Sequence, residues 1–246
     1  MKDKLTVLQN FIIPDEARYN HIKSELGISA TAKVLGDCNW VVNYKTKSYF
    51  EEIFFLYSNH LNNLKFANHI EDKNFLWANV TLELLKEVKT PYVFYLTEDR
   101  MFHNTTKEEF SDIMTEVANN DIGFMCIGKI QKYGLVAHPP AVQSNKSIGA
   151  PPYMDNDDHI FTYLCKDTPY GCVSADSIFR VDVLKYALEK IIKSDARSWA
   201  GPWSQRPHVL EQMGQWMKDE MPDMLCAVPK KHVIVSDDDP GYELGK

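Results

Sequence analysis

Short apolar runs alternate with amphipathic segments along the first half of the chain. The first run ends at Pro14, and acidic residues from Asp15 follow it as in the first turn of a helix, which Gly27 would end. Runs rich in branched and aromatic residues predict strands at 5–13, 40–44, 53–57 and 92–96. Between the last two, apolar residues at helical spacing predict a helix at 75–88, which ends at Thr90-Pro91.

The second half continues the alternation after an interruption. A capping-box pattern from Thr106 to Glu109 predicts a helix at 106–118. Prolines, glycines and an acidic run mark a long loop region at about 129–170, and loops of this length are usually functional or disordered. Beyond it we expect strands at 177–180, 225–228 and 232–235 and helices at 181–192 and 208–218. A further buried strand is expected at 122–127.

Strands that alternate with helices predict an α/β domain with a mostly parallel central sheet flanked by helices. Ligands of such sheets bind beyond the carboxyl ends of the strands. This rule directs attention to Pro14, to Asn59 after the strand expected at 53–57, and above all to Glu98 and Asp99 after the strand expected at 92–96.

Composition restricts the class of protein. The 246 residues suit one domain, and a net charge of -7 with no stripe of lysine and arginine argues against nucleic acid as a partner. No apolar run reaches the length of a membrane span, and no targeting segment is evident. The five cysteines are scattered without a C-x-x-C pair, which favours reduced thiols in a cytoplasmic protein over a zinc site.

Two adjacent carboxylates at the end of an apolar strand raise each other's pKa, and partial burial adds a desolvation cost. A divalent cation would offset both, and hard oxygen ligands suit Mg²⁺ or Mn²⁺. Alternatively, one carboxylate of Glu98-Asp99 caps the following turn while the other pairs with Arg100.

The stretch from Asn74 to Asp99 resembles the central segment of GT-A glycosyltransferases, especially those of glycosyltransferase family 2. In that family a helix containing an asparagine precedes a strand that leads into an acidic motif. The resemblance implies that Asp99 is the metal ligand, that Glu98 and Arg100 lie near the ribose or diphosphate, and that Asn79 matches the helix asparagine. Residues 53–101 carry most of it.

A second part of the resemblance lies near the carboxyl terminus. It implies that Glu211, on the helix expected at 208–218, is the general base, and that Asp176 borders the acceptor pocket. His232 falls in a region where several GT-A enzymes place a metal-binding histidine. Three features depart from the family pattern. No aspartate lies two positions before Asp99, Gln212 follows Glu211, and the segment 30–47 is extra or rearranged.

Several residues keep two interpretations. Asn59 could bind the nucleotide or form a turn with its own backbone, and Pro14 could border the base pocket or simply end a strand. The tryptophans could stack on a sugar or base, or belong to the core; they are Trp199, Trp203 and Trp216. The acidic runs at 155–158 and 237–239 are expected to be solvated.

The resemblance implies a metal-assisted, inverting transfer of a sugar from a UDP- or GDP-sugar to a glycan or lipid-linked acceptor, as in polysaccharide biosynthesis. Residues 1–128 would bind the nucleotide-sugar and residues 129–246 the acceptor, with 129–170 as a lid. Peripheral membrane association would not be visible in the sequence. Two alternatives remain, a non-catalytic GT-A-like binding protein and a sugar-phosphate nucleotidyltransferase. The nucleotidyltransferase would normally have a glycine-rich phosphate loop where Pro14-Asp15-Glu16 stands.

Overall fold

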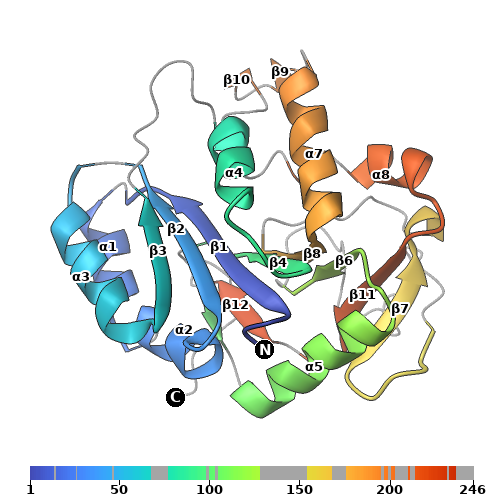
Figure 1. Ribbon diagram of the computed structural model, residues 1–246, viewed down its shortest axis with the longest axis horizontal. Coiled ribbons are helices and arrows are strands. Elements are labelled where there is room, and N and C mark those ends of the chain that lie inside the picture. Colours follow the sequence, from blue (N-terminus) through green and yellow to red (C-terminus); the bar gives the residue numbers. More distant parts are fainter. Residues whose placement is uncertain are drawn as a thin grey trace.

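The computed structural model shows a central sheet with helices on both faces (Figure 1). The described residues are 1–13, 15–25, 27–45, 47–67, 77–97, 100–102, 105–127, 154–167, 176–194, 197–198, 201–202, 210, 214–231 and 233–236. Most of the lid expected at 129–170 therefore lies outside the described residues. No helix among the described ranges is long and apolar enough to cross a membrane.

The helices and strands largely alternate along the chain. The helices are α1 (Glu16–Lys23), α2 (Ile28–Leu35), α3 (Phe50–His60), α4 (Trp77–Leu85), α5 (Lys107–Asn119), η1 (Cys165–Asp167), α7 (Val181–Lys193) and α8 (Gly214–Glu220). The strands are β1 (Leu5–Phe11), β2 (Asn39–Tyr44), β3 (Asn63–Ala67), β4 (Tyr92–Tyr95), β5 (Arg100–Phe102), β6 (Phe124–Cys126), β7 (Ile160–Leu164), β8 (Ser177–Arg180), β9 (Arg197–Ser198), β10 (Gly201–Pro202), β11 (Leu225–Pro229) and β12 (Ile234–Ser236).

Eight strands form the main sheet in the order β3-β2-β1-β4-β8-β6-β11-β7. Strands β3, β2, β1 and β4 are parallel to one another, and β11 is parallel to β6. Strand β8 is antiparallel to β4 and β6, and β7 is antiparallel to β11. The predicted α/β architecture is confirmed, with parallel pairing in the majority. The inserted β8 and the edge strand β7 are antiparallel to their neighbours and give the sheet its mixed character.

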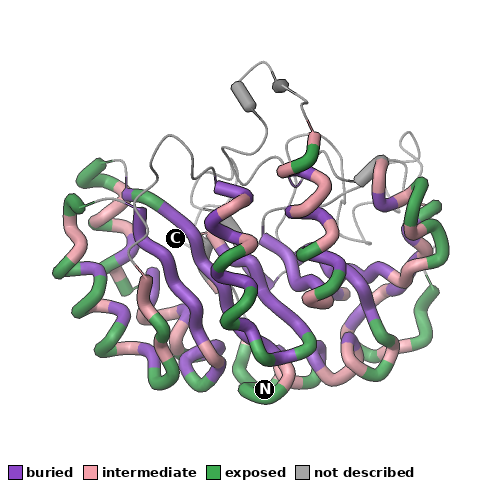
Figure 2. Tube along the Cα trace, turned by 45° about the horizontal axis from the view of Figure 1, so that its top comes forward, coloured by how far each residue is buried: buried purple, intermediate pink, exposed green. Residues whose placement is uncertain are grey.

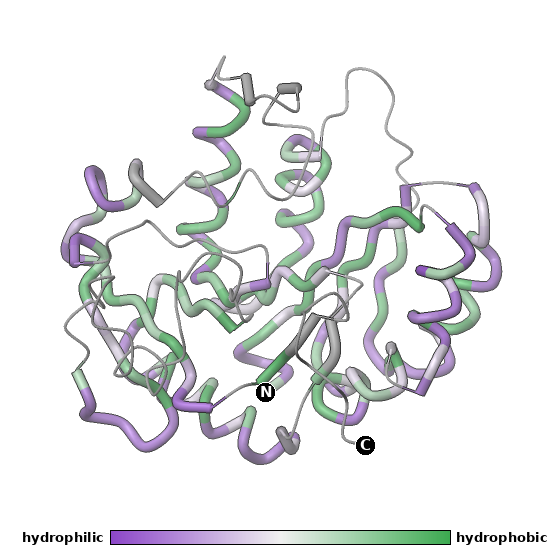
Figure 3. The backbone as a smooth tube through the Cα atoms, turned by 180° about the vertical axis from the view of Figure 1, so that it is seen from behind, coloured by the Kyte–Doolittle hydropathy of each residue, from purple (hydrophilic) through white to green (hydrophobic). Residues whose placement is uncertain are grey.

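Two hydrophobic cores fill the space between the sheet and its helices. Helices α1, α2, α3 and α5 bury Ile22, Leu35, Ile53 and Phe110 against one face. Helices α4, α7 and α8 cover the other, and Figure 1 shows α4 and α7 standing side by side on it. The central strands are buried along most of their length (Figure 2), and apolar residues are concentrated in them (Figure 3).

Helix α5 has the cap that its sequence predicts. The Thr106 hydroxyl accepts a hydrogen bond from the Glu109 amide at 3.2 Å, and the Glu109 carboxylate accepts one from the Thr106 amide at 3.1 Å. This pairing satisfies two amide groups that have no partner inside the helix.

The prediction of a strand at 53–57 is wrong, because these residues lie in helix α3. Only Ile53 and Tyr57 of this apolar run are fully buried, and their spacing of four residues is that of a helix. Phe54 and Phe55 remain 46% and 68% exposed. The strand of this region is β3, which begins only at Asn63.

The structure describes most of the segment 30–47, which the sequence analysis expects to be extra or rearranged relative to the family. This segment supplies most of α2 and then β2, which pairs in parallel with β1 from Thr6–Asn39 to Phe11–Tyr44. The predicted strand at 232–235 is shifted to β12, which pairs with β5 outside the main sheet. In the predicted helix at 208–218, the described helical residues are those of α8.

Candidate functional site

The carboxyl ends of β1, β2 and β4 lie together, because β1 is parallel to β2 on one side and to β4 on the other. Beyond β4 the ladder continues for one more bond, in which the Leu96 amide donates to the Leu8 carbonyl at 3.1 Å. Glu98 and Asp99 follow Thr97 in the sequence and lie outside the described residues. The last described residues before the acidic pair are therefore part of the sheet edge.

A buried polar network crosses this edge on the α4 side. The Asn10 side-chain amide donates to the Thr81 hydroxyl at 2.8 Å and to the Trp77 carbonyl at 3.3 Å. Its oxygen accepts a hydrogen bond from the Asn43 amide at 2.9 Å. The Trp77 indole in turn donates to the Tyr95 hydroxyl at 2.7 Å. These bonds join the ends of β1, β2 and β4 to the first turn of α4.

The Asp176 carboxylate lies directly beside the end of β4. It is fully buried, and its Oδ1 accepts hydrogen bonds from the Thr97 amide at 2.9 Å and from the Thr97 hydroxyl at 2.6 Å. The Asp176 carbonyl accepts a hydrogen bond from the Ile127 amide at 3.3 Å. Asp176 therefore ties the end of β4 to the end of β6.

Strand β5 begins one residue beyond Asp99 and pairs with β12. In this two-stranded ribbon Arg100 lies opposite Ser236, and Phe102 lies opposite Ile234. In the sequence Asp99 directly precedes Arg100, at one end of this ribbon. His232 precedes Val233, so it adjoins the opposite end of the ribbon, where Ile234 lies.

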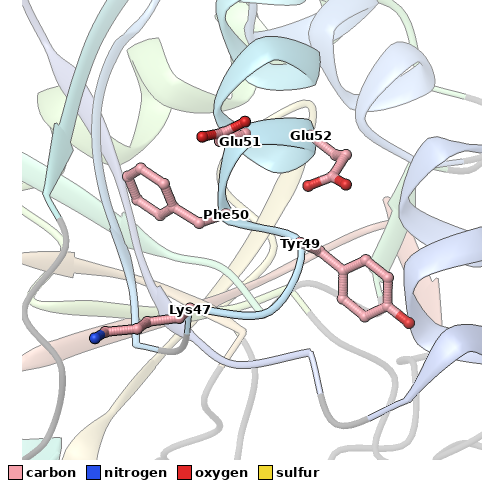
Figure 4. Close-up of a pocket in the computed structure, with 5 residues that line it drawn as sticks. All are labelled: Lys47, Tyr49, Phe50, Glu51 and Glu52. Atoms are coloured by element: carbon pink, nitrogen blue, oxygen red, sulfur yellow. The ribbon is translucent and has the colours of Figure 1, made fainter.

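A hollow of about 440 Å³ opens where β2 leads into α3. It is lined by Lys47, Tyr49, Phe50, Glu51 and Glu52. In Figure 4 Tyr49 and Glu52 lie on one side of the helix start, and Phe50 and Glu51 on the other. Tyr49 has a left-handed backbone (φ 59°) and stacks on Tyr19 of α1 at 4.5 Å between ring centroids. Two glutamates and one lysine make this lining acidic.

Neither a family model nor a curated protein sequence matches the chain. Solved structures do match it. Staphylococcus aureus TarS in complex with UDP-GlcNAc is 17% identical with a TM-score of 0.58, and the match covers 95% of this chain and 58% of that one. The mannosyltransferase PcManGT of Pyrobaculum calidifontis, in complex with GDP-Man and Mn²⁺, is 12% identical with a TM-score of 0.53, covering 98% and 59%.

The chain has the GT-A fold. The same architecture extends to 4-diphosphocytidyl-2C-methyl-D-erythritol synthase of Anaerococcus prevotii, at 10% identity and a TM-score of 0.51, covering 94% of this chain and 89% of that one. The chain spans about 60% of the TarS 1-349 structures that it matches and 36% of the longer TarS structure.

Several predicted site residues of this GT-A domain lie outside the described residues. They are Pro14, Glu98, Asp99, Glu211 and His232, and Arg100 is described only in its backbone pairing. Asn79 lies in the first turn of α4 and is half-buried. Among the ranges that the structure describes, no group of three histidine, cysteine or acidic side chains could hold a metal ion.

The prediction that Asn59 follows the carboxyl end of a strand is wrong. Asn59 does not end a strand, because it lies exposed in the last turn of α3. That turn leads into the amino end of β3, and the ligand edge of a parallel strand is its carboxyl end. The strand-end position that suggested nucleotide binding is therefore absent.

Other predictions fall on the surface and the core. Trp216 is half-buried against the second core, as its structural interpretation predicts, whereas Trp199 and Trp203 lie outside the described residues. The run 155–158 is solvated as predicted: Asp155, Asn156 and Asp158 are exposed, and the half-buried Asp157 accepts a hydrogen bond from the Asn120 amide at 2.9 Å. Residues 237–239 are outside the described ranges.

The sequence analysis missed Lys45, which follows β2 at the same edge of the GT-A sheet. Its amide donates to the Phe11 carbonyl at 3.1 Å, and its side chain is only 9% exposed. Lysine is almost never fully buried unless it is paired, because removing the ammonium from water is costly. A lysine that directly follows a buried strand at the ligand edge is the signal that would have found it.

Proposed function

We propose that this GT-A domain transfers a sugar from a nucleoside-diphosphate sugar to an acceptor hydroxyl with the help of a divalent cation. The observation that carries the proposal is that Glu98-Asp99 begins two residues after Leu96 in the sequence, and Leu96 makes the last hydrogen bond of the β4 ladder, to Leu8. Carboxyl ends of parallel strands are where ligands of such sheets bind. Likeness in fold to structures that contain UDP-GlcNAc and GDP-Man with Mn²⁺ supports it.

The residues have distinct roles in this proposal. Asp99 would hold the cation, and Glu98 and Arg100 would contact the ribose or diphosphate. His232 has no part in this proposal, because the antiparallel register of β5 and β12 places the residues that precede Arg100 and Val233 at opposite ends of the ribbon. When bound, the cation would supply positive charge for the departing diphosphate.

Glu211 takes the proton of the acceptor hydroxyl as the sugar is transferred. A single base without a carboxylate nucleophile favours direct attack and inversion at the sugar carbon. A glycan or lipid-linked acceptor is the proposed substrate on this side.

Lys45 is the proposed cationic contact for the donor diphosphate. It lies one strand from β1 and two strands from β4 in the parallel part of the sheet. Its fixed backbone and covered side chain would cost little further ordering when an anion binds.

A nucleotidyltransferase is the second candidate, favoured by the 89% coverage of the Anaerococcus enzyme. The first strand–helix turn argues against it. There the Asp15 carboxylate caps α1 by accepting a hydrogen bond from the Arg18 amide at 2.9 Å. A negative charge at this turn would repel a triphosphate.

Calorimetry tests the proposal with UDP, GDP and their sugar conjugates, each with Mn²⁺ and with EDTA. Metal-dependent binding by the wild type that is lost in Asp99→Ala is expected. Asp112→Ala, which removes an exposed carboxylate on α5, is the matched control and should bind normally. Absence of nucleotide binding under every condition would refute the proposal. Release of pyrophosphate from CTP with a sugar phosphate would favour the nucleotidyltransferase instead.

A second measurement addresses catalysis. Glu211→Gln should keep the Kd for the donor and slow sugar transfer, or hydrolysis of the donor, by about 100-fold or more, since general bases contribute factors of that order. Unchanged turnover would remove Glu211 from the mechanism. NMR of the anomeric proton of the product distinguishes inversion from retention.

A further inference from the structure

Asp176 is a fully buried carboxylate in the middle of the main sheet edge. It directly precedes β8, whose Ser177 lies opposite Tyr95 of β4 and Cys126 of β6. One of its oxygens accepts both the amide and the hydroxyl hydrogen of Thr97, at 2.9 and 2.6 Å. Thr97 is the residue immediately before Glu98-Asp99.

We propose that Asp176 is a positioning residue for the acidic pair and not a substrate contact. Its side chain is fully covered by protein, which leaves no surface for a sugar. Hydrogen bonds to an ionised acceptor are shorter and about twice as strong as neutral ones. The two bonds fix the Thr97 backbone and its side-chain rotamer together, and with them the direction in which the chain leaves β4.

The effect on function follows from chain geometry, and it rests on the metal-dependent donor binding proposed above. Asp99 is two residues beyond Thr97, so a change in the Thr97 backbone angles moves the whole carboxylate pair. Misplacement of a reacting group by about 1 Å can cost a factor of about 100. Weaker metal-dependent nucleotide binding is therefore expected when the Asp176–Thr97 contact is broken.

Two substitutions at Thr97 separate the hydroxyl from the rest of the residue. Thr97→Val keeps the amide donor and nearly the same shape but removes the hydroxyl donor. Thr97→Ser restores the hydroxyl. Asp176→Asn keeps an oxygen acceptor but loses the negative charge, and it changes the buried volume little.

Thr6 provides the matched control at the opposite edge of the same sheet. Its hydroxyl is buried and forms a hydrogen bond with the Thr90 hydroxyl at 2.8 Å. Thr6→Val removes one buried hydroxyl bond, as Thr97→Val does, but far from the acidic pair. Both variants should lower Tm, and Thr97→Val should lower it at least as much, because its lost bond is to a carboxylate.

The test measures Kd for UDP and GDP with Mn²⁺ by calorimetry, together with Tm of each variant. About 10-fold or greater weakening is expected in Thr97→Val and Asp176→Asn. Thr97→Ser should bind like the wild type, and Thr6→Val should lose stability without losing affinity. Equal affinities in Thr97→Val and the wild type would overturn the inference, as would equal losses in Thr97→Val and Thr6→Val. A wild type that binds no nucleotide would refute the proposed function itself.

Discussion

Asn10 is expected to be a stability determinant of the whole ligand edge. In Asn10→Ala three hydrogen bonds disappear, those to Thr81 at 2.8 Å, to the Trp77 carbonyl at 3.3 Å and from Asn43 at 2.9 Å. Each buried bond contributes about 1 kcal/mol to the free energy of unfolding. The loss is therefore about 3 kcal/mol, near the upper end of what single substitutions do.

Compensation for this loss is limited. The Trp77 carbonyl keeps a second donor, since the Thr81 hydroxyl donates to it at 2.7 Å. The Asn43 amide loses an acceptor in a fully buried position, which adds to the cost. Asn10→Asp should be no better, because a carboxylate accepts hydrogen bonds but cannot donate to Thr81 and Trp77.

Urea unfolding at constant temperature measures the effect. Asn39→Ala is the matched control on the neighbouring strand, because the Asn39 amide makes one solvent-exposed bond, to the Lys2 carbonyl at 2.9 Å. The control should change the free energy of unfolding by no more than about 0.5 kcal/mol. If the free energy of unfolding of Asn10→Ala differs from that of the wild type by no more than about 0.5 kcal/mol, the network does not stabilise this edge of the sheet.

Three further predictions concern single side chains. Lys45→Met should weaken binding of UDP but not of uridine, whereas the exposed Lys47→Met should change neither, and calorimetry with both ligands decides it. The buried Ser177 hydroxyl has no hydrogen-bond partner among the residues that the structure describes, so Ser177→Ala should leave Tm unchanged or raise it; a clear fall would contradict this. Hydrogen bonds from Arg180 lower the pKa of Asp182, so this pair stabilises the fold above about pH 4 and ceases to do so as the pH falls through the lowered value. The wild type should therefore lose more Tm than Arg180→Met between about pH 6 and pH 3, and equal losses would refute the assignment.

Local signals in the sequence were sufficient for many elements. Strands β1 and β4 are short apolar runs with clear ends, and both were predicted within two residues at each end. Helix α5 was predicted from a capping box that the structure contains. In each case the residues that decide the conformation lie next to one another in the chain.

The errors arise where burial is decided by distant residues. The run 53–57 is apolar throughout, and only its packing against β2 and β3 shows that Ile53 and Tyr57 face the core while Phe55 does not. The sequence analysis did not predict strand β3. It is an edge strand with exposed Asn63 and Lys65, so its alternation of apolar and polar residues is weak.

The residues of the candidate site also fall into two groups, those predicted from their neighbours in the sequence and those that only the fold reveals. The sequence alone predicted Glu98-Asp99 at the end of a strand, since that depends only on neighbouring residues. Lys45 and the Asp176–Thr97 contact depend on the fold, because Asp176 and Thr97 are 79 residues apart. The sequence placed Asp176 at the acceptor pocket by resemblance, without its partner.

The direction of β8 explains how these two residues meet. If β8 were parallel to β4, its amino end would lie at the opposite edge of the sheet from Thr97. Because β8 is antiparallel, the residue that precedes it lies beside the residue that follows β4. Asp176 can therefore accept hydrogen bonds from Thr97 only because β8 runs antiparallel to β4. The one strand that breaks the parallel order between β4 and β6 thus brings a buried carboxylate next to Thr97, the residue that precedes the acidic pair. Substitutions that shift the register of β8 should therefore weaken metal-dependent donor binding, as is expected of Thr97→Val.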